Sequence, residues 1–112
     1  MQTSDLGKTS TGIQANVAAL LTYVLGVITG VIFYLIEKEN KFVRFHAIQS
    51  SITFGGLLVL GIVLGYVPIV GVMLMPILGI AEIILWIFLM IKAYQGELFK
   101  LPVVGDMAEK YV

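Results

Sequence analysis

Four polar side chains recur along one face of a helix predicted in the middle of the chain. They are His46, Gln49, Ser50 and Thr53. Their spacing of i, i+3, i+4 and i+7 places them on one side of the helix, at about 100° per residue. Because polar groups in apolar surroundings need partners, this face predicts either hydrogen bonds between helices or a site that handles a proton, an ion or a substrate. The imidazole of His46 could change charge near neutral pH.

A single acidic residue, Glu82, interrupts an otherwise uncharged stretch between Ala47 and Ile91. None of its helical neighbours is a cation, and an unpaired carboxylate in an apolar medium is costly. We therefore expect the Glu82 carboxyl to be protonated and hydrogen-bonded, to act in a proton relay, or to pair with a cation of another subunit. The hydroxyl groups that could serve as partners are those of Tyr23, Thr29 and Thr53.

Arg44, Lys92 and Tyr94 flank the apolar segments at positions typical of the membrane interface. Arg44 points away from the polar face, so it could reach lipid phosphates or pair with Glu37. Together with His46 these residues predict one composite patch at the cytoplasmic surface.

Catalytic and metal-binding motifs are missing from the sequence. It has no cysteine, and its one histidine has no second ligand three or four residues away. It has no phosphate loop, paired carboxylates at one depth, or triad with a recognisable elbow. We predict neither an enzyme nor a cofactor; an enzyme acting on lipid remains as a third hypothesis.

The composition is that of a membrane protein. Of the 112 residues, 59% are hydrophobic and only 12% are charged, and the mean hydropathy is +1.00, far outside the range of soluble proteins. The seven basic and seven acidic residues cancel, so no basic surface suggests nucleic acid.

Two apolar stretches, the first without charge and the second with Glu82 as its single charge, are long enough for three spans of about 20 residues each. We predict one all-α membrane domain over residues 1–112, an integral three-helix bundle. Its parts are a flexible polar amino terminus (1–12), span 1 (13–36), a loop (37–41), span 2 (42–65), span 3 (68–94) and an interfacial tail (95–112). Pro76 would kink the third span.

Glycine pairs spaced by four residues predict where helices approach closely. Gly26 and Gly30 lie in the first span, and Gly61 and Gly65 in the second. Small residues let apolar helices pack without a hydrophobic driving force, so we interpret these pairs as packing seams.

The distribution of lysine and arginine predicts the orientation in a cell membrane. With three spans, the amino terminus and second loop share one side and carry only Lys8. The other side carries Lys38, Lys41, Arg44, Lys92, Lys100 and Lys110. Six against one predicts a multi-pass protein with its amino terminus outside and its first loop and carboxy terminus in the cytoplasm.

Three segments carry a resemblance to a known family. They read IEKENKFVRFHAIQS from Ile36, KAYQGE from Lys92 and LPVVGD from Leu101. The chain resembles a family of small prokaryotic membrane proteins of unknown function, regarded as distant relatives of the small membrane subunit of the chloroplast inner-envelope import translocon. The resemblance implies a helical membrane domain, places Arg44, His46, Gln49 and Ser50 in the family signature, and suggests a translocon-like role in a protein-conducting path.

Three helices enclose too little volume for a wide channel in one copy. Our leading hypothesis is a non-enzymatic integral membrane protein that associates with itself or with a larger complex, through its glycine seams and cytoplasmic patch. The alternative is a transport component in which His46, Gln49, Thr53 and Glu82 line a proton, ion or peptide path.

Overall fold

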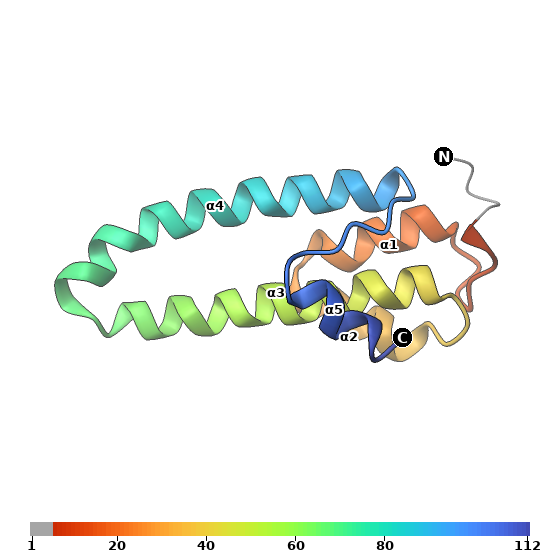
Figure 1. The fold of residues 1–112 in the computed structure, drawn as a ribbon, viewed down its shortest axis with the longest axis horizontal. Coiled ribbons are helices and arrows are strands. Elements are labelled where there is room, and N and C mark those ends of the chain that lie inside the picture. The colour runs from red at the N-terminus through yellow and green to blue at the C-terminus, as the bar shows by residue number, and fades with distance from the viewer. Residues whose placement is uncertain (1–5) are drawn as a thin grey trace.

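The computed structural model describes residues 6–112, and residues 1–5 of the predicted flexible amino terminus lie outside this part. The described chain is helical throughout its regular structure, which confirms the all-α class (Figure 1). The helices are α1 (Ala15–Val24), α2 (Val27–Ile36), α3 (Lys41–Gly65), α4 (Pro68–Tyr94) and α5 (Val104–Glu109).

The two long helices, α3 and α4, have the length and composition of membrane spans. They have 25 and 27 residues and are the two helices long and apolar enough to cross a membrane. Their bounds lie within one residue of those predicted for spans 2 and 3. Tyr66 and Val67 connect them, and Pro68 begins α4, where its missing N–H leaves no helical bond unmade. Pro76 lies inside α4, which continues through it.

The first apolar segment differs from the prediction, because the chain reverses direction at Gly26 (Figure 1). Ala15 and Phe33 pack in one cluster, although a continuous helix would separate them by about 27 Å. The two helices have ten residues each, or about 15 Å, half of what a span requires. The single span predicted for residues 13–36 is therefore wrong, and α1 and α2 form a short helical hairpin.

Gly26 makes the reversal possible, since its φ of +60° is a conformation that L side chains rarely adopt. Side chains of the long helices donate hydrogen bonds to carbonyl oxygens around the break. The hydroxyl proton of Ser50 is shared between the carbonyl oxygens of Thr22 (2.7 Å) and Gly26 (3.0 Å). The indole N–H of Trp86 donates to the Tyr23 carbonyl at 2.6 Å. Such compensation is what irregular backbone requires at membrane depth.

The hairpin packs closely against the long helices. A Cβ on Gly30 would lie 3.0 Å from the carbonyl oxygen of Ala47 and 2.7 Å from the hydroxyl of Ser51, so only glycine lets α2 lie this close to α3. Helix α1 lies between α3 and α4 along part of their length (Figure 1). Gly26 and Gly30 thus pack against α3 of the same chain.

The hairpin covers only part of the long helices. We call residues 55–81, which include the turn between α3 and α4, the distal half, and the remaining described residues the proximal half. In the distal half only Gly71 is buried. A Cβ on Gly71 would overlap the carbonyl oxygen of Leu64, so the turn itself is tight.

The amino-terminal segment and the first loop lie at the same end of the molecule. The side-chain amide of Asn40 donates to the carbonyl oxygens of Leu6 (2.8 Å) and Lys8 (3.0 Å). The hydroxyl oxygen of Ser10 accepts from the amide of Lys38 at 2.9 Å. The prediction that put these segments on opposite sides of the membrane is therefore wrong, because the hairpin returns the chain to the end from which it started.

Candidate functional site

His46 is the centre of a buried hydrogen-bond network. Its side chain is 0% exposed, and its Nε2 lies 3.0 Å from the carbonyl oxygen of Glu97. Because a carbonyl can only accept, Nε2 carries the proton and Nδ1 is the acceptor. The Tyr23 hydroxyl, 2.7 Å from Nδ1, must therefore donate to it.

Gln49 extends the same network to the tail. Its amide nitrogen donates to the Tyr23 hydroxyl (3.1 Å) and to the carbonyl oxygen of Phe99 (2.8 Å). Its side-chain oxygen accepts from the amide of Leu101 at 2.9 Å. Each polar atom of the Gln49 amide has a partner, so one side chain fixes two main-chain groups of the tail.

The network joins three elements that are far apart in sequence: α1 through Tyr23, α3 through His46 and Gln49, and the tail through its backbone. Aromatic rings surround the imidazole edge-on, with centroids 4.6 Å away for Phe42 and 5.4 Å away for Phe45. With both nitrogens bonded and no solvent contact, His46 is arranged to hold the fold together, and a proton relay through the ring would first require the bond from Nε2 to the Glu97 carbonyl oxygen to break.

Ser50 and Thr53 complete the predicted polar face, with different outcomes. Ser50 bonds the backbone of the hairpin tip. Thr53 is 8% exposed, and its hydroxyl has no partner among the described residues. Sequence reasoning missed Asn16, whose amide donates to the carbonyl oxygen of Tyr94 at 3.0 Å and so ties α1 to the end of α4. An asparagine at the start of an apolar segment was the available signal.

Arg44 bonds main-chain carbonyl groups at the carboxyl end of α2. Its guanidinium donates to the carbonyl oxygens of Tyr34 (3.1 Å) and Glu37 (2.6 Å), and its Nε donates to that of Val112 at 3.1 Å. It also lies 4.3 Å from the centroid of the Tyr34 ring. A cation at a helix carboxyl end is favoured by the helix dipole. Arg44 thus bonds the main chain of Glu37 and not, as predicted, its carboxylate.

The carboxylate of Glu37 organises the first loop, a role that sequence reasoning missed. One oxygen accepts from the amides of Ser10 (2.8 Å), Asn40 (3.0 Å) and Glu39 (3.1 Å). Burial alone would raise the pKa of the Glu37 carboxyl, but these amide bonds outweigh it and hold the pKa below its ordinary value of 4.5. The loop is therefore built around a negative charge.

Lys92 and Tyr94 lie at the proximal end of α4. The ammonium of Lys92 is 3.0 Å from the carboxylate of Glu97, and this pair is partly exposed. Tyr94 is exposed. Since His46 is buried, it does not join Arg44, Lys92 and Tyr94 in the surface patch that was predicted.

Glu82 lies at the tip of the hairpin and away from the His46 network. It is half-buried and helps to line a cavity of about 220 Å³ together with Gly26, Phe54, Ile83 and Trp86. The three predicted hydroxyl partners do not reach it: Tyr23 donates to His46, Thr29 bonds the hairpin backbone, and Thr53 has no partner.

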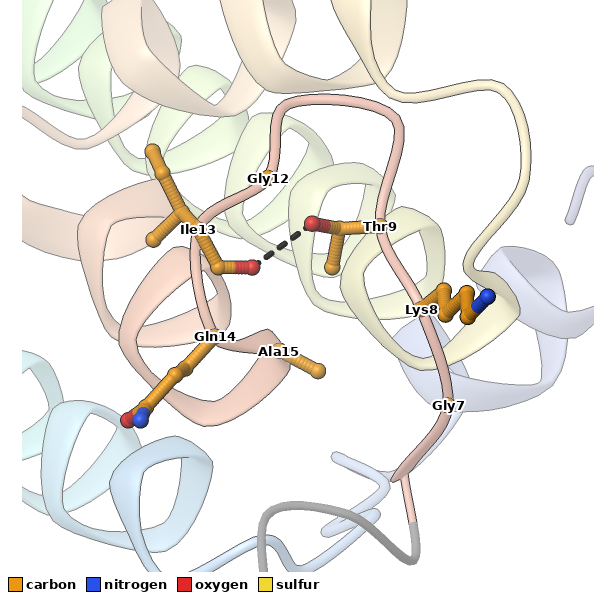
Figure 2. A pocket seen from close by; sticks show the side chains of 7 residues that line it. All are labelled: Gly7, Lys8, Thr9, Gly12, Ile13, Gln14 and Ala15. Atoms are coloured by element: carbon orange, nitrogen blue, oxygen red, sulfur yellow. Dashed lines mark hydrogen bonds between the residues drawn. The ribbon is translucent and has the colours of Figure 1, made fainter.

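A larger cavity, of about 380 Å³, lies in the curled amino-terminal segment, residues 7–15. Figure 2 shows the Thr9 hydroxyl donating to the Ile13 carbonyl oxygen, at 2.6 Å, across the curl. The side chains of Lys8 and Gln14 point in opposite directions from it. This arrangement brings no set of reactive groups together. Among residues 6–112, no cluster of three histidine or acidic side chains could hold a metal ion.

Comparisons with known proteins give similarities along most of the chain. The model of a family described as "Magnetosome magnetite crystal formation protein family" matches residues 8–108. A UPF0132 membrane protein of Methanocaldococcus jannaschii is 57% identical over 106 residues, 95% of this chain and 96% of its own length. One of Archaeoglobus fulgidus is 55% identical over 97 residues, 87% of this chain and 94% of its own length. No solved structure matches.

These relatives carry no name that indicates an enzyme, and they are named as membrane proteins of an uncharacterised family. They support the predicted class of small prokaryotic membrane proteins. The further resemblance to the chloroplast translocon subunit stays a prediction.

Proposed function

Because the chain belongs to the magnetosome magnetite crystal formation protein family, whose archaeal relatives are membrane proteins, we propose that it is a non-enzymatic accessory subunit embedded in a membrane through α3 and α4. One contrast supports this proposal. The polar side chains that could do chemistry hold the proximal half together, whereas the described residues of α3 and α4 in the distal half are mostly exposed.

The non-enzymatic part of the proposal is supported by how His46, Gln49 and Ser50 are used. Each is buried and hydrogen-bonded to another segment of the chain. A catalytic group must instead touch a substrate. Transport through the same face is not favoured, since both nitrogens of His46 are already bonded.

Association is supported by the open faces of the distal half. Nothing lies within 4 Å of where a Cβ would stand on Gly61 or Gly65, so this pair is available to a neighbouring helix. Exposed apolar surface alone gives no driving force in lipid, but close backbone approach at such a pair does. We therefore assign self-association to Gly61 and Gly65 and no longer to Gly26 and Gly30.

Self-association is tested by fluorescence energy transfer between labelled copies in lipid vesicles. Gly61→Leu is expected to reduce the transfer. Gly56→Leu is the matched control, because Gly56 is also open but faces away from the Gly61 side of α3. Equal transfer for wild type and Gly61→Leu would refute this seam.

The orientation proposed for the structure differs from the one predicted. All seven lysine and arginine residues lie in the proximal half and none in the distal half. The positive-inside rule therefore puts the proximal end, with both ends of the described chain, in the cytoplasm. The relatives support a membrane location, and this side assignment is our proposal.

The absence of cysteine makes the orientation simple to test with single thiols. Tyr66, which is 85% exposed at the distal turn, and Glu39, exposed in the first loop, are each replaced by cysteine. An impermeant maleimide added to intact cells should label Tyr66→Cys and leave Glu39→Cys unlabelled until the membrane is permeabilised. The reverse pattern would contradict the proposal.

A further inference from the structure

Glu82 lies near the middle of α4, the more apolar of the two helices long enough to span a membrane. It follows Pro68 by 14 residues and precedes Tyr94 by 12 within α4, which places it about 21 Å and about 18 Å from the two helix ends. It is partly exposed, and no hydrogen bond or ion pair to its carboxyl is present among the described residues. An ionisable group at this depth is expensive unless something neutralises it.

Two of the residues that line the cavity beside Glu82 are held by hydrogen bonds. Ser50 bonds the carbonyl oxygen of Gly26 at 3.0 Å, which fixes the hairpin tip. Trp86 is held by its 2.6 Å bond to the Tyr23 carbonyl oxygen. Phe54 and Trp86 also supply aromatic surface, to which ammonium and guanidinium groups are attracted. A preformed site of this kind needs little ordering when it is occupied.

An apolar groove lies further along the distal half. It has a volume of about 280 Å³ between α3 and α4 and is lined by Leu60, Leu64, Leu74, Ile77, Leu78 and Ala81. Glu82 does not line this groove, but Leu78 does and precedes Glu82 by four residues in α4, so the two side chains are neighbours on one face of the helix. The two features together offer apolar contact along a helix and one charge at mid-depth.

A second copy of this chain cannot supply the missing positive charge. The lysine and arginine residues all lie in the proximal half, and Lys92, ten residues along α4 from Glu82, is about 15 Å away along the axis. A parallel copy brings its cations to the same end, and an antiparallel copy brings them to the opposite membrane surface. Neither places one at the depth of Glu82.

We propose that the groove between the distal halves of α3 and α4 docks a transmembrane helix of another protein, one that carries a lysine or arginine at mid-membrane, with Glu82 as its counter-charge. The argument is charge complementarity: each charge is costly alone in hydrocarbon, and pairing removes most of that cost for both. This inference rests on the proposed role as an accessory subunit and names the partner of its membrane face.

The test uses a designed helix as the probe. A leucine-rich transmembrane peptide of about 22 residues with one central lysine is titrated into phosphatidylcholine vesicles that contain the full-length protein, labelled at Glu39→Cys. Energy transfer should show binding at least about fivefold tighter than for the same peptide with a central leucine. The preference should vanish in Glu82→Gln and persist in Glu97→Gln, whose carboxylate lies at the proximal end.

Charge reversal makes the test independent of how well Glu82→Gln folds. Glu82→Lys should prefer a peptide with a central glutamate over the lysine peptide. Equal binding of the lysine and leucine peptides to the wild type, or no exchange of preference in Glu82→Lys, would overturn the inference. Binding that depends on Gly61 but not on the peptide charge would refute the docked basic helix and leave the proposed accessory role unaffected. Binding that depends on neither Gly61 nor the peptide charge would refute both the docked helix and the accessory role.

Discussion

The proximal and distal halves are built on the same two long helices but are stabilised in different ways. In the proximal half, α3 buries His46, Gln49 and Ser50 against an interrupted backbone and an irregular tail. In the distal half, α3 and α4 are regular, apolar and mostly exposed. A regular helix satisfies its own backbone, whereas a broken one needs polar side chains from its neighbours. The buried polar side chains of α3 therefore lie where the neighbouring backbone is irregular.

The largest effect is expected from Gln49→Leu, which leaves the Phe99 carbonyl and the Leu101 amide without their side-chain partner and removes the bond that the Tyr23 hydroxyl accepts. At about 1–3 kcal/mol for each buried group left unbonded, we expect a loss of about 3–5 kcal/mol. Thermal unfolding in detergent, followed by the fluorescence of the one tryptophan, Trp86, measures it. The control is Thr53→Val, which replaces a hydroxyl that has no partner and should leave stability unchanged or raise it. Similar losses for both would refute the contrast.

The next effect compares one glycine from each half. Gly30→Ala places a methyl group 3.0 Å from the Ala47 carbonyl oxygen and should destabilise the fold by about 1–3 kcal/mol through overpacking. Gly61→Ala meets open space and should be neutral or slightly stabilising. The same unfolding measurement applies. A neutral Gly30→Ala would mean that α2 does not need its close approach to α3.

A pH effect should be confined to the proximal end. Because folding lowers the pKa of Glu37 below 4.5, its stabilisation is fully present above that value and is lost as the pH falls through the lower, folded pKa. The hydrogen-exchange protection of residues 6–14 and 37–40, relative to the intrinsic exchange rate at each pH, should therefore fall in acid before that of residues 60–72. Glu37→Gln should cost about 1–2 kcal/mol at neutral pH and flatten this acid response; an unchanged response would exclude Glu37 as its source.

The smallest effect is expected at Glu97, whose side chain lies in the proximal half but outside its buried hydrogen-bond network. Glu97 contributes its carbonyl oxygen to His46, while its carboxylate forms a partly exposed pair with Lys92. Glu97→Gln keeps the backbone bond and should change stability by at most about 0.5 kcal/mol. A larger loss in thermal unfolding would show that the side chain, and not the main chain, holds the tail.

The sequence predicted the membrane class and both long helices, because length and hydropathy are local properties. It did not predict the hairpin. Residues 13–36 have the length and composition of a span, and the reversal depends on one glycine conformation together with bonds from Ser50 and Trp86. These partners lie 24 and 63 residues from the groups they bond. No local pattern contains that information.

The candidate site was predicted in part for a similar reason. Helical spacing identified His46 and Gln49 as neighbours on one face, and the structure brings them into one network. Their partners include the backbone of Glu97, Phe99 and Leu101. A main-chain carbonyl or amide is present at nearly every residue, so sequence offers no means of choosing which one is used.

The short connection between α3 and α4 has a consequence for how the protein is made. Only Tyr66 and Val67 separate the two long helices, and no charged residue lies between Arg44 and Glu82. In the orientation that we propose, insertion would transfer two uncharged residues across the lipid, with the long helices entering together as a pair. The α1–α2 hairpin would then enter from the side on which synthesis takes place, and no part of it would be translocated.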